Sequence, residues 1–257
     1  MLAIGVAILL WIIFAPPSQI AEWKVRTSGT VSEIVSRISG MSVRYDRYAR
    51  LAFYAGKQEV RCPEQGDRTA VVLAIGQSNV ANHGAQRYQS DPAGAVVNYF
   101  AGACYAAESP LLGATGSGGE SLALFGSKLV RTRGFERVIL IPLGIAHTPI
   151  SRWRRGGDLN RLLLDVMEDA SKRYRITHVI WNQGEADAAL ETPAAAYAEM
   201  LSSLVASLRE IGVSAPVFVS VTTRCGPAAS WKSGNPVALA QRAAIDPVRG
   251  VRAGPDT

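Results

Sequence analysis

The chain contains little cysteine and little histidine. Among its 257 residues there are three cysteines and three histidines. Three cysteines are too few for a disulfide-stapled scaffold or for a metal site with four cysteine ligands. Charged residues make up 19% of the chain and apolar residues 48%, so a sizeable core can form and general disorder is excluded.

A strong excess of one charge is also lacking. Lys and Arg number 27 against 21 Asp and Glu, which gives a net charge of +6 that is spread along the chain. Proteins dedicated to nucleic-acid binding cluster their basic residues on one face, so we expect no nucleic-acid partner. The balance fits a soluble domain, or one that lies near an anionic membrane surface.

Residues 2–15 form an unbroken apolar run that is followed by Pro16 and Pro17. Fourteen helical residues span about 21 Å, which is shorter than the hydrocarbon core of about 30 Å. An uncleaved signal or short membrane anchor, a cleaved signal peptide and a buried core helix are all compatible with this run, although no basic residue precedes it. We expect residues 1–17 to form an apolar helix that serves as a membrane anchor or signal segment and contacts the membrane.

Residues 18–67 are expected to form a lead-in or stalk with short helices. Apolar side chains at helical spacing predict a helix over residues 31–38. A second amphipathic helix is predicted over residues 45–55, where arginines alternate with Tyr48, Leu51 and Phe53. Such a helix would pack on the domain or on the membrane surface.

From residue 68 onward, short apolar runs alternate with longer helical patterns. The runs predict strands over residues 70–75, 96–100, 137–143, 178–181 and 216–221. The patterns between them predict helices over residues 121–132, 159–174, 193–211 and 237–245. This alternation predicts one α/β domain over residues 68–257, with a parallel sheet covered by helices on both faces in three layers.

The loops at the carboxyl ends of such strands are where ligands bind. The first strand is followed by Gly76-Gln77-Ser78-Asn79. A serine at a tight turn between a strand and a helix presents both its hydroxyl and its own N–H, which suits a nucleophile. The more ordinary role of such a serine is to cap the next helix.

Two further loops carry groups that suit ester chemistry. The segment 182–187 (Asn-Gln-Gly-Glu-Ala-Asp) follows a strand and offers an amide donor and two carboxylates. The segment 113–121 is rich in glycine and opens a helix, so its backbone N–H groups can bind an oxyanion. It has neither the Gly-Lys-Ser/Thr of a Walker loop nor the leading strand of a dinucleotide fingerprint.

Taken together, GQSN at 76–79, the glycine-rich block and NQGEAD at 182–187 resemble the SGNH/GDSL hydrolase superfamily. Within it, the chain resembles the sialate O-acetylesterase-like carbohydrate esterases over about residues 61–257. The resemblance implies a flavodoxin-like central sheet and a serine-dependent esterase that removes O-acetyl groups from a saccharide. It implies neither a metal nor another cofactor.

The resemblance assigns roles residue by residue. Ser78 matches the nucleophile, and its N–H, an N–H of Gly118 and the side chain of Gln183 match the oxyanion hole. Further positions of the same motifs are expected to support the site: Gln77, Asn79, Gly119, Glu185 and Asp187.

In the resembling family, the general base that activates the serine is a histidine in an Asp-x-x-His block. This block follows a stretch that matches residues 254–257, and the 257 residues do not include it. Either the chain is a fragment cut before the block or it is a degenerate, inactive member, and in both cases we expect little turnover. Of the histidines present, His178 is expected to pack within a strand, and His83 lies too close to Ser78 in sequence to take its proton. His147 is the best substitute.

The cysteines allow two interpretations. The resemblance implies a further cysteine in the block with the catalytic histidine as partner of Cys225, which leaves Cys62 and Cys104 as a disulfide. The alternative is three free thiols in a cytosolic protein. Because polysaccharides are commonly processed outside the cytoplasm, we expect an exported or membrane-anchored, periplasmic domain.

Thr148 and Trp153 are predicted to bind the saccharide, because a tryptophan flanked by arginines can stack on a sugar ring and bind acidic groups. The alternative is a tryptophan that covers the sheet edge. The sequence thus predicts a carbohydrate O-acetylesterase. The alternatives are a non-catalytic saccharide-binding protein and a polysaccharide O-acetyltransferase of the same fold.

Overall fold

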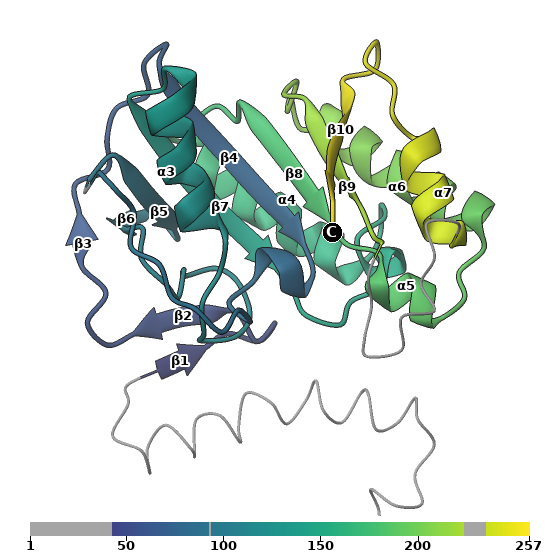
Figure 1. Ribbon diagram of the computed structural model, residues 1–257, viewed down its shortest axis with the longest axis horizontal. Coiled ribbons are helices and arrows are strands. Elements are labelled where there is room, and N and C mark those ends of the chain that lie inside the picture. The colour runs from purple at the N-terminus through teal and green to yellow at the C-terminus, as the bar shows by residue number, and fades with distance from the viewer. Residues whose placement is uncertain (1–42, 93, 224–234) are drawn as a thin grey trace, which may run out of the picture.

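A computed structural model of the chain describes residues 43–92, 94–223 and 235–257 (Figure 1). The apolar helix predicted over residues 1–17 and the helix predicted over residues 31–38 lie outside the described residues. Among the residues that are described, no helix combines the length and the hydrophobicity needed to cross a membrane.

An eight-stranded sheet with the order β10-β9-β8-β4-β7-β5-β6-β3 forms the centre of the domain. Its strands are β3 (Glu59–Val60), β4 (Thr69–Gly76), β5 (Val96–Phe100), β6 (Ala103–Ala106), β7 (Arg137–Gly144), β8 (His178–Asn182), β9 (Val217–Val221) and β10 (Val251–Asp256). Strands β5, β7, β4, β8, β9 and β10 run parallel, and β6 and β3 add an antiparallel edge. The predicted parallel sheet is confirmed, and β10 is a further strand that the apolar pattern did not predict.

Helices cover both faces of the sheet, which gives three layers (Figure 1). Helix α3 (Leu122–Arg133) packs on one face, and α4 (Asp158–Ser171), α6 (Ala194–Glu210) and α7 (Pro236–Ala243) pack on the other. Strand β4 is buried along its whole length, because alternate side chains enter the two cores. The four predicted helices are confirmed to within a few residues at their ends.

The predicted helix over residues 45–55 is wrong. These residues form an antiparallel hairpin of β1 (Val43–Tyr45) and β2 (Leu51–Tyr54). The turn is held by Asp46, whose Oδ1 accepts hydrogen bonds from the N–H groups of Tyr48 and Arg50. A carboxylate that bonds to its own nearby backbone favours a turn over a helix.

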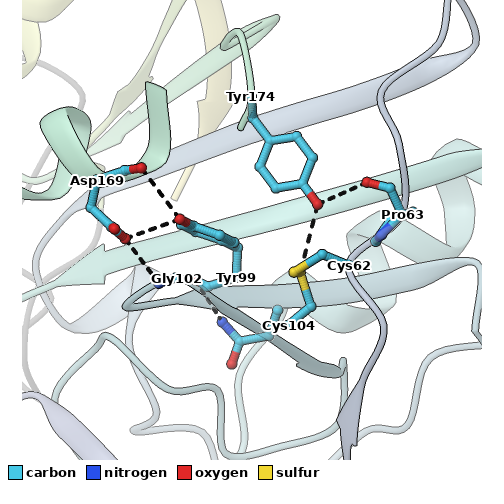
Figure 2. Close-up of a disulfide and its surroundings, with 8 residues drawn as sticks. Cys62, Pro63, Tyr99, Gly102, Cys104, Asp169 and Tyr174 are labelled. Atoms are coloured by element: carbon cyan, nitrogen blue, oxygen red, sulfur yellow. Dashed lines mark hydrogen bonds between the residues drawn. A yellow bond between two sulfur atoms is a disulfide. The ribbon is translucent and has the colours of Figure 1, made fainter. Parts of the chain in front are cut away.

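The described part of the predicted lead-in belongs to the domain. Strand β3 pairs with β6 in the main sheet, and two residues later Cys62 forms a disulfide with Cys104 of β6 (Figure 2). The hydroxyl of Tyr174 donates a 2.9 Å hydrogen bond to the carbonyl of Pro63 beside this disulfide. The pairing of Cys62 with Cys104 is therefore confirmed, and Cys225 lies outside the described residues.

Candidate active site

Ser78 lies at a tight turn directly beyond the central strand. Gly76, the last residue of β4, has a φ of +139°, and a Cβ at this position would lie 2.0 Å from the carbonyl oxygen of Asn182. Only glycine therefore allows β4 and β8 to come so close where the turn begins. The N–H of Gln77 donates to the same carbonyl at 3.0 Å, and Ser78 then opens the short 3₁₀ helix η1 (Ser78–Val80).

Neither the hydroxyl nor the N–H of Ser78 has a hydrogen-bond partner within the described part of the chain. Ser78 therefore does not act as the cap of a helix there. It lines an open cleft of about 690 Å³ together with Asn79, His83, Tyr88 and Glu120. Within the described residues, Ser78 thus combines an unpartnered hydroxyl and an unpartnered N–H at the edge of an open cleft.

Gln77 and Asn79 join the nucleophile turn to the loop after β8. Nδ2 of Asn79 donates to Oε1 of Glu185 at 2.6 Å. Oε1 of Gln77 accepts the N–H of Ala186 at 3.2 Å, in the first turn of α5 (Glu185–Ala189). The side chains of Gln77, Asn79 and Glu185 thus join the two loops. Burial raises the pKa of Glu185 above its ordinary value, and a backbone hydrogen bond opposes this shift.

The side chain of Gln183 is fully buried and does not offer a free donor. Its Nε2 donates to the carbonyl of Thr148 at 3.0 Å and to Oδ2 of Asp187 at 2.6 Å. Its Oε1 accepts the hydroxyl of Tyr197 at 3.0 Å. Both hydrogens of the Gln183 amide are used in these bonds, so neither is free to donate to an oxyanion. In this structure Gln183 instead stabilises the loop after β8.

Asp187 is the buried acceptor at the centre of that loop. Besides Gln183, its carboxylate accepts the N–H of Ile150 at 2.7 Å and the hydroxyl of Thr192 at 3.0 Å. Three donors to one carboxylate offset the cost of burying its charge. Asp187 thus ties Gln183 to Ile150 and to Thr192.

The glycine-rich loop lies against the segment that follows Ser78. The N–H of Gly118 donates to the carbonyl of Asn82 at 2.8 Å, and the N–H of Gly119 donates to the carbonyl of Gly84 at 2.7 Å. The N–H of Gly118, the expected oxyanion donor of this loop, is thus used to pair the two segments, as is the N–H of Gly119. Asn82, which the motifs did not single out as a site residue, accepts the first of these bonds.

The three histidines occupy different surroundings. His83 lines the cleft, and its Nε2 lies 3.1 Å from Oγ1 of Thr115. Burial, and to a smaller extent the nearby His147, lower the pKa of His83. His147 is exposed with a φ of +60°, and His178 of β8 stacks on Phe218, as expected of a packed histidine.

Thr148 and Trp153 do not reach the surface. Their side chains are 1% and 0% exposed. The indole N–H of Trp153 donates to Oγ1 of Thr148 at 3.0 Å, and its ring meets that of Trp181 edge to face at 5.6 Å. The structure thus corrects the predicted saccharide contact, because both side chains belong to the core beneath the loops. Part of the flanking charge is paired, since Arg152 bonds to Asp158.

The chain is similar to one protein family and to solved structures of two proteins. The model of the family described as "Carbohydrate esterase, sialic acid-specific acetylesterase" matches residues 68–249. No curated protein matches the chain. A solved structure of a protein from Arabidopsis thaliana is similar in fold, with a TM-score of 0.56 and 19% identity over 73% of this chain and 85% of the other. The crystal structure of NanS aligns with a TM-score of 0.49 and 16% identity, over 71% of this chain and 74% of NanS.

Proposed function

The chain belongs to the carbohydrate esterase family of sialic acid-specific acetylesterases, and from this premise we propose that it hydrolyses O-acetyl esters of saccharides through an acetyl intermediate on Ser78. The observation that carries the proposal is the position of Ser78. It opens the turn beyond the central strand and lines a cleft, and its hydroxyl and N–H have no partner among the described residues.

The proposed reaction uses that geometry. The Ser78 hydroxyl attacks the acetyl carbonyl and loses its proton to a base, while the N–H of Ser78 donates to the oxygen that becomes negative. The sugar hydroxyl leaves with a proton, and water then releases acetate from the serine. By resemblance the base belongs to an Asp-x-x-His block, and in the described part of the chain His83 is the histidine that shares the cleft with Ser78.

The test compares hydrolysis of an O-acetylated sialic acid by the wild type, Ser78→Ala and His83→Ala. We expect Ser78→Ala to abolish hydrolysis above the background rate, and His83→Ala to stay within about threefold of the wild type if the base lies elsewhere. Equal rates for the wild type and Ser78→Ala, together with no labelling of Ser78 by a fluorophosphonate in the wild type, would overturn the serine mechanism.

A non-catalytic saccharide-binding protein is the second candidate, and one observation favours it. The N–H of Gly118 and the amide of Gln183, both expected to bind the oxyanion, are engaged in bonds within the protein. This candidate predicts saccharide binding by calorimetry without acetate release, and equal binding by Ser78→Ala.

We also propose that the domain works outside the cytoplasm. Disulfides persist mainly in oxidising compartments, and the Cys62–Cys104 disulfide supports this location. The test is thiol alkylation of the protein in its native cells before and after reduction. Alkylation of Cys62 without prior reduction would contradict the proposed location.

A further inference from the structure

Asn82 contacts the glycine-rich loop with both its side chain and its backbone. Its side chain is 1% exposed, with Oδ1 accepting the N–H of Leu111 and Nδ2 donating to the carbonyl of Leu111, both at 2.8 Å. Nδ2 also lies 3.4 Å from the carbonyl oxygen of Gly116. The backbone N–H of Asn82 donates to the carbonyl of Thr115 at 2.8 Å, and its carbonyl accepts the N–H of Gly118. One residue, four positions after Ser78, thus bridges residues 111–118.

The close approach of the two segments requires glycine. Gly116 has a φ of +83°, and a Cβ there would lie 2.4 Å from the carbonyl oxygen of Asn82 and 2.9 Å from Cε1 of His83. A paired set of hydrogen bonds between Gly84 and Gly119 continues the contact. The loop is therefore fitted to the backbone of the segment that follows the nucleophile.

The other edge of the loop is fixed by different elements. The N–H of Leu51 in β2 donates to the carbonyl of Ala114, and its carbonyl accepts the N–H of Gly113. The N–H of Thr115 donates to the carbonyl of Gly144 at the end of β7. These contacts hold one edge of the loop, and the other edge, which faces the segment after Ser78, is held by Asn82 together with the Gly84–Gly119 pair.

We propose that Asn82 is a positioning residue, which holds the glycine-rich loop at a fixed distance from Ser78, so that the loop supports the turn that carries the nucleophile. The role rests on the proposed function of Ser78. A displacement of about 1 Å at a catalytic group can cost about 10²-fold in rate. The side chain of Asn82 acts through the loop and does not itself touch substrate.

Asn98 of β5 provides a matched control. Its side chain is also fully buried, its Oδ1 accepts the N–H of Leu112 at 2.7 Å, and its Nδ2 donates to the carbonyl of Leu112 at 3.1 Å. The two asparagines therefore bond in the same way to neighbouring residues. Asn82 also contacts Gly116 through its side-chain amide and Gly118 through its backbone carbonyl. Asn98 forms no hydrogen bond with either glycine within the described residues.

The experiment compares the full chain with its Asn82→Ala and Asn98→Ala variants. We expect similar losses of Tm, because each variant removes the same pair of buried hydrogen bonds. Only Asn82→Ala should lower kcat for acetyl ester hydrolysis and the rate of Ser78 labelling by a fluorophosphonate, by about 30-fold, with KM within about threefold. Amide hydrogen exchange over residues 113–119 should be at least about tenfold faster in Asn82→Ala than in Asn98→Ala.

Equal effects of the two variants on kcat, or unchanged exchange over residues 113–119 in Asn82→Ala, would overturn the positioning role. If Asn82→Ala does not fold, Asn82→Asp, which keeps the acceptor for the N–H of Leu111, takes its place in the same comparison. Failure of the proposed function is recognised separately. In that case the wild type and Ser78→Ala react alike, while amide exchange alone still decides whether Asn82 holds the loop.

Discussion

The side-chain amide of Asn79 donates a 2.6 Å hydrogen bond to Oε1 of Glu185, across two loops that are 106 residues apart in sequence. This bond links the turn that carries Ser78 to the loop after β8. The second carboxylate oxygen, Oε2, is buried and has no partner within the described residues. Burial raises the pKa of Glu185. The unpartnered oxygen carries a desolvation cost, while the bond from Asn79 ties Glu185 to the turn.

Two substitutions of Glu185 distinguish the contribution of its acceptor oxygen from that of its charge. Glu185→Gln keeps an oxygen for Asn79 and removes the charge, so we expect kcat for acetyl ester hydrolysis to stay within about threefold and stability to rise or stay equal. Glu185→Ala removes the acceptor and should lower kcat about tenfold. In a double-mutant cycle, Asn79→Ala combined with Glu185→Ala should cost no more than either change alone. Additive losses would show that the two side chains act independently.

The burial of Trp153 leads to a prediction about stability rather than binding. Trp153→Ala removes the edge contact with Trp181 and the hydrogen bond to Thr148, so we expect a loss of about 3–5 kcal/mol in the free energy of unfolding. Urea unfolding measures the loss, and Trp153→Phe should keep most of the stability. Calorimetry should give the same saccharide affinity for Trp153→Phe as for the wild type. A clear loss of affinity in Trp153→Phe would return this residue to the binding site.

The parallel sheet could be predicted because its strands are buried on both faces. Residues 70–75 of β4 are all apolar for that reason, and such a run is visible in sequence. The β1–β2 hairpin could not be predicted in the same way. Its turn depends on the contacts of Asp46 with Tyr48 and Arg50 and on a positive φ at Ala49, and apolar spacing reports none of these.

Sequence motifs located the loops of the site but not the direction of their side chains. The placement of Ser78 follows from the strand that precedes it and from the glycine before the turn. The orientation of Gln183 depends on Asp187 and on the carbonyl of Thr148, which reach it only through the tertiary fold. The N–H of Gly118 is similarly taken by Asn82. Such partners are set by packing between distant elements, which short motifs do not encode.

Loss of the disulfide should destabilise the domain without affecting the cleft. Cys62 and Cys104 are 42 residues apart, and a loop of that length predicts a stabilisation of about 4 kcal/mol. We expect the double variant Cys62→Ala/Cys104→Ala to lose about that much in urea unfolding. Reduction of the wild type should produce a similar loss.

Tyr174 gives a control for the same region, since its hydroxyl bonds to Pro63 beside the disulfide (Figure 2). Tyr174→Phe should cost only about 1 kcal/mol. The labelling rate of Ser78 should be unchanged in both variants at a temperature where both are folded. A slower rate in the double variant alone would link the disulfide to the site.

The amine of Lys57 is held among backbone carbonyls. Its Nζ donates to the carbonyl of Glu108 at 2.5 Å and lies 3.4 Å from that of Ala106. Burial lowers the pKa of Lys57 from 10.5 to about 8, against the opposing effect of the carboxylates of Glu108 and Glu120. In the folded protein the amine therefore loses its proton at a lower pH than in the unfolded chain.

This shift makes stability depend on pH in a defined direction. Between pH 8 and 10.5 the unfolded chain binds more protons at Lys57 than the folded protein does, so the free energy of unfolding contributed by Lys57 rises with pH in that window and is lost as pH falls to 8. Relative to Lys57→Met, the wild type should gain on the order of 2 kcal/mol between pH 8 and 10 in urea unfolding. The exposed Lys172, replaced in the same way, should show no such trend. If the difference between the wild type and Lys57→Met is constant over this range, the Lys57 amine does not experience the burial that the structure shows.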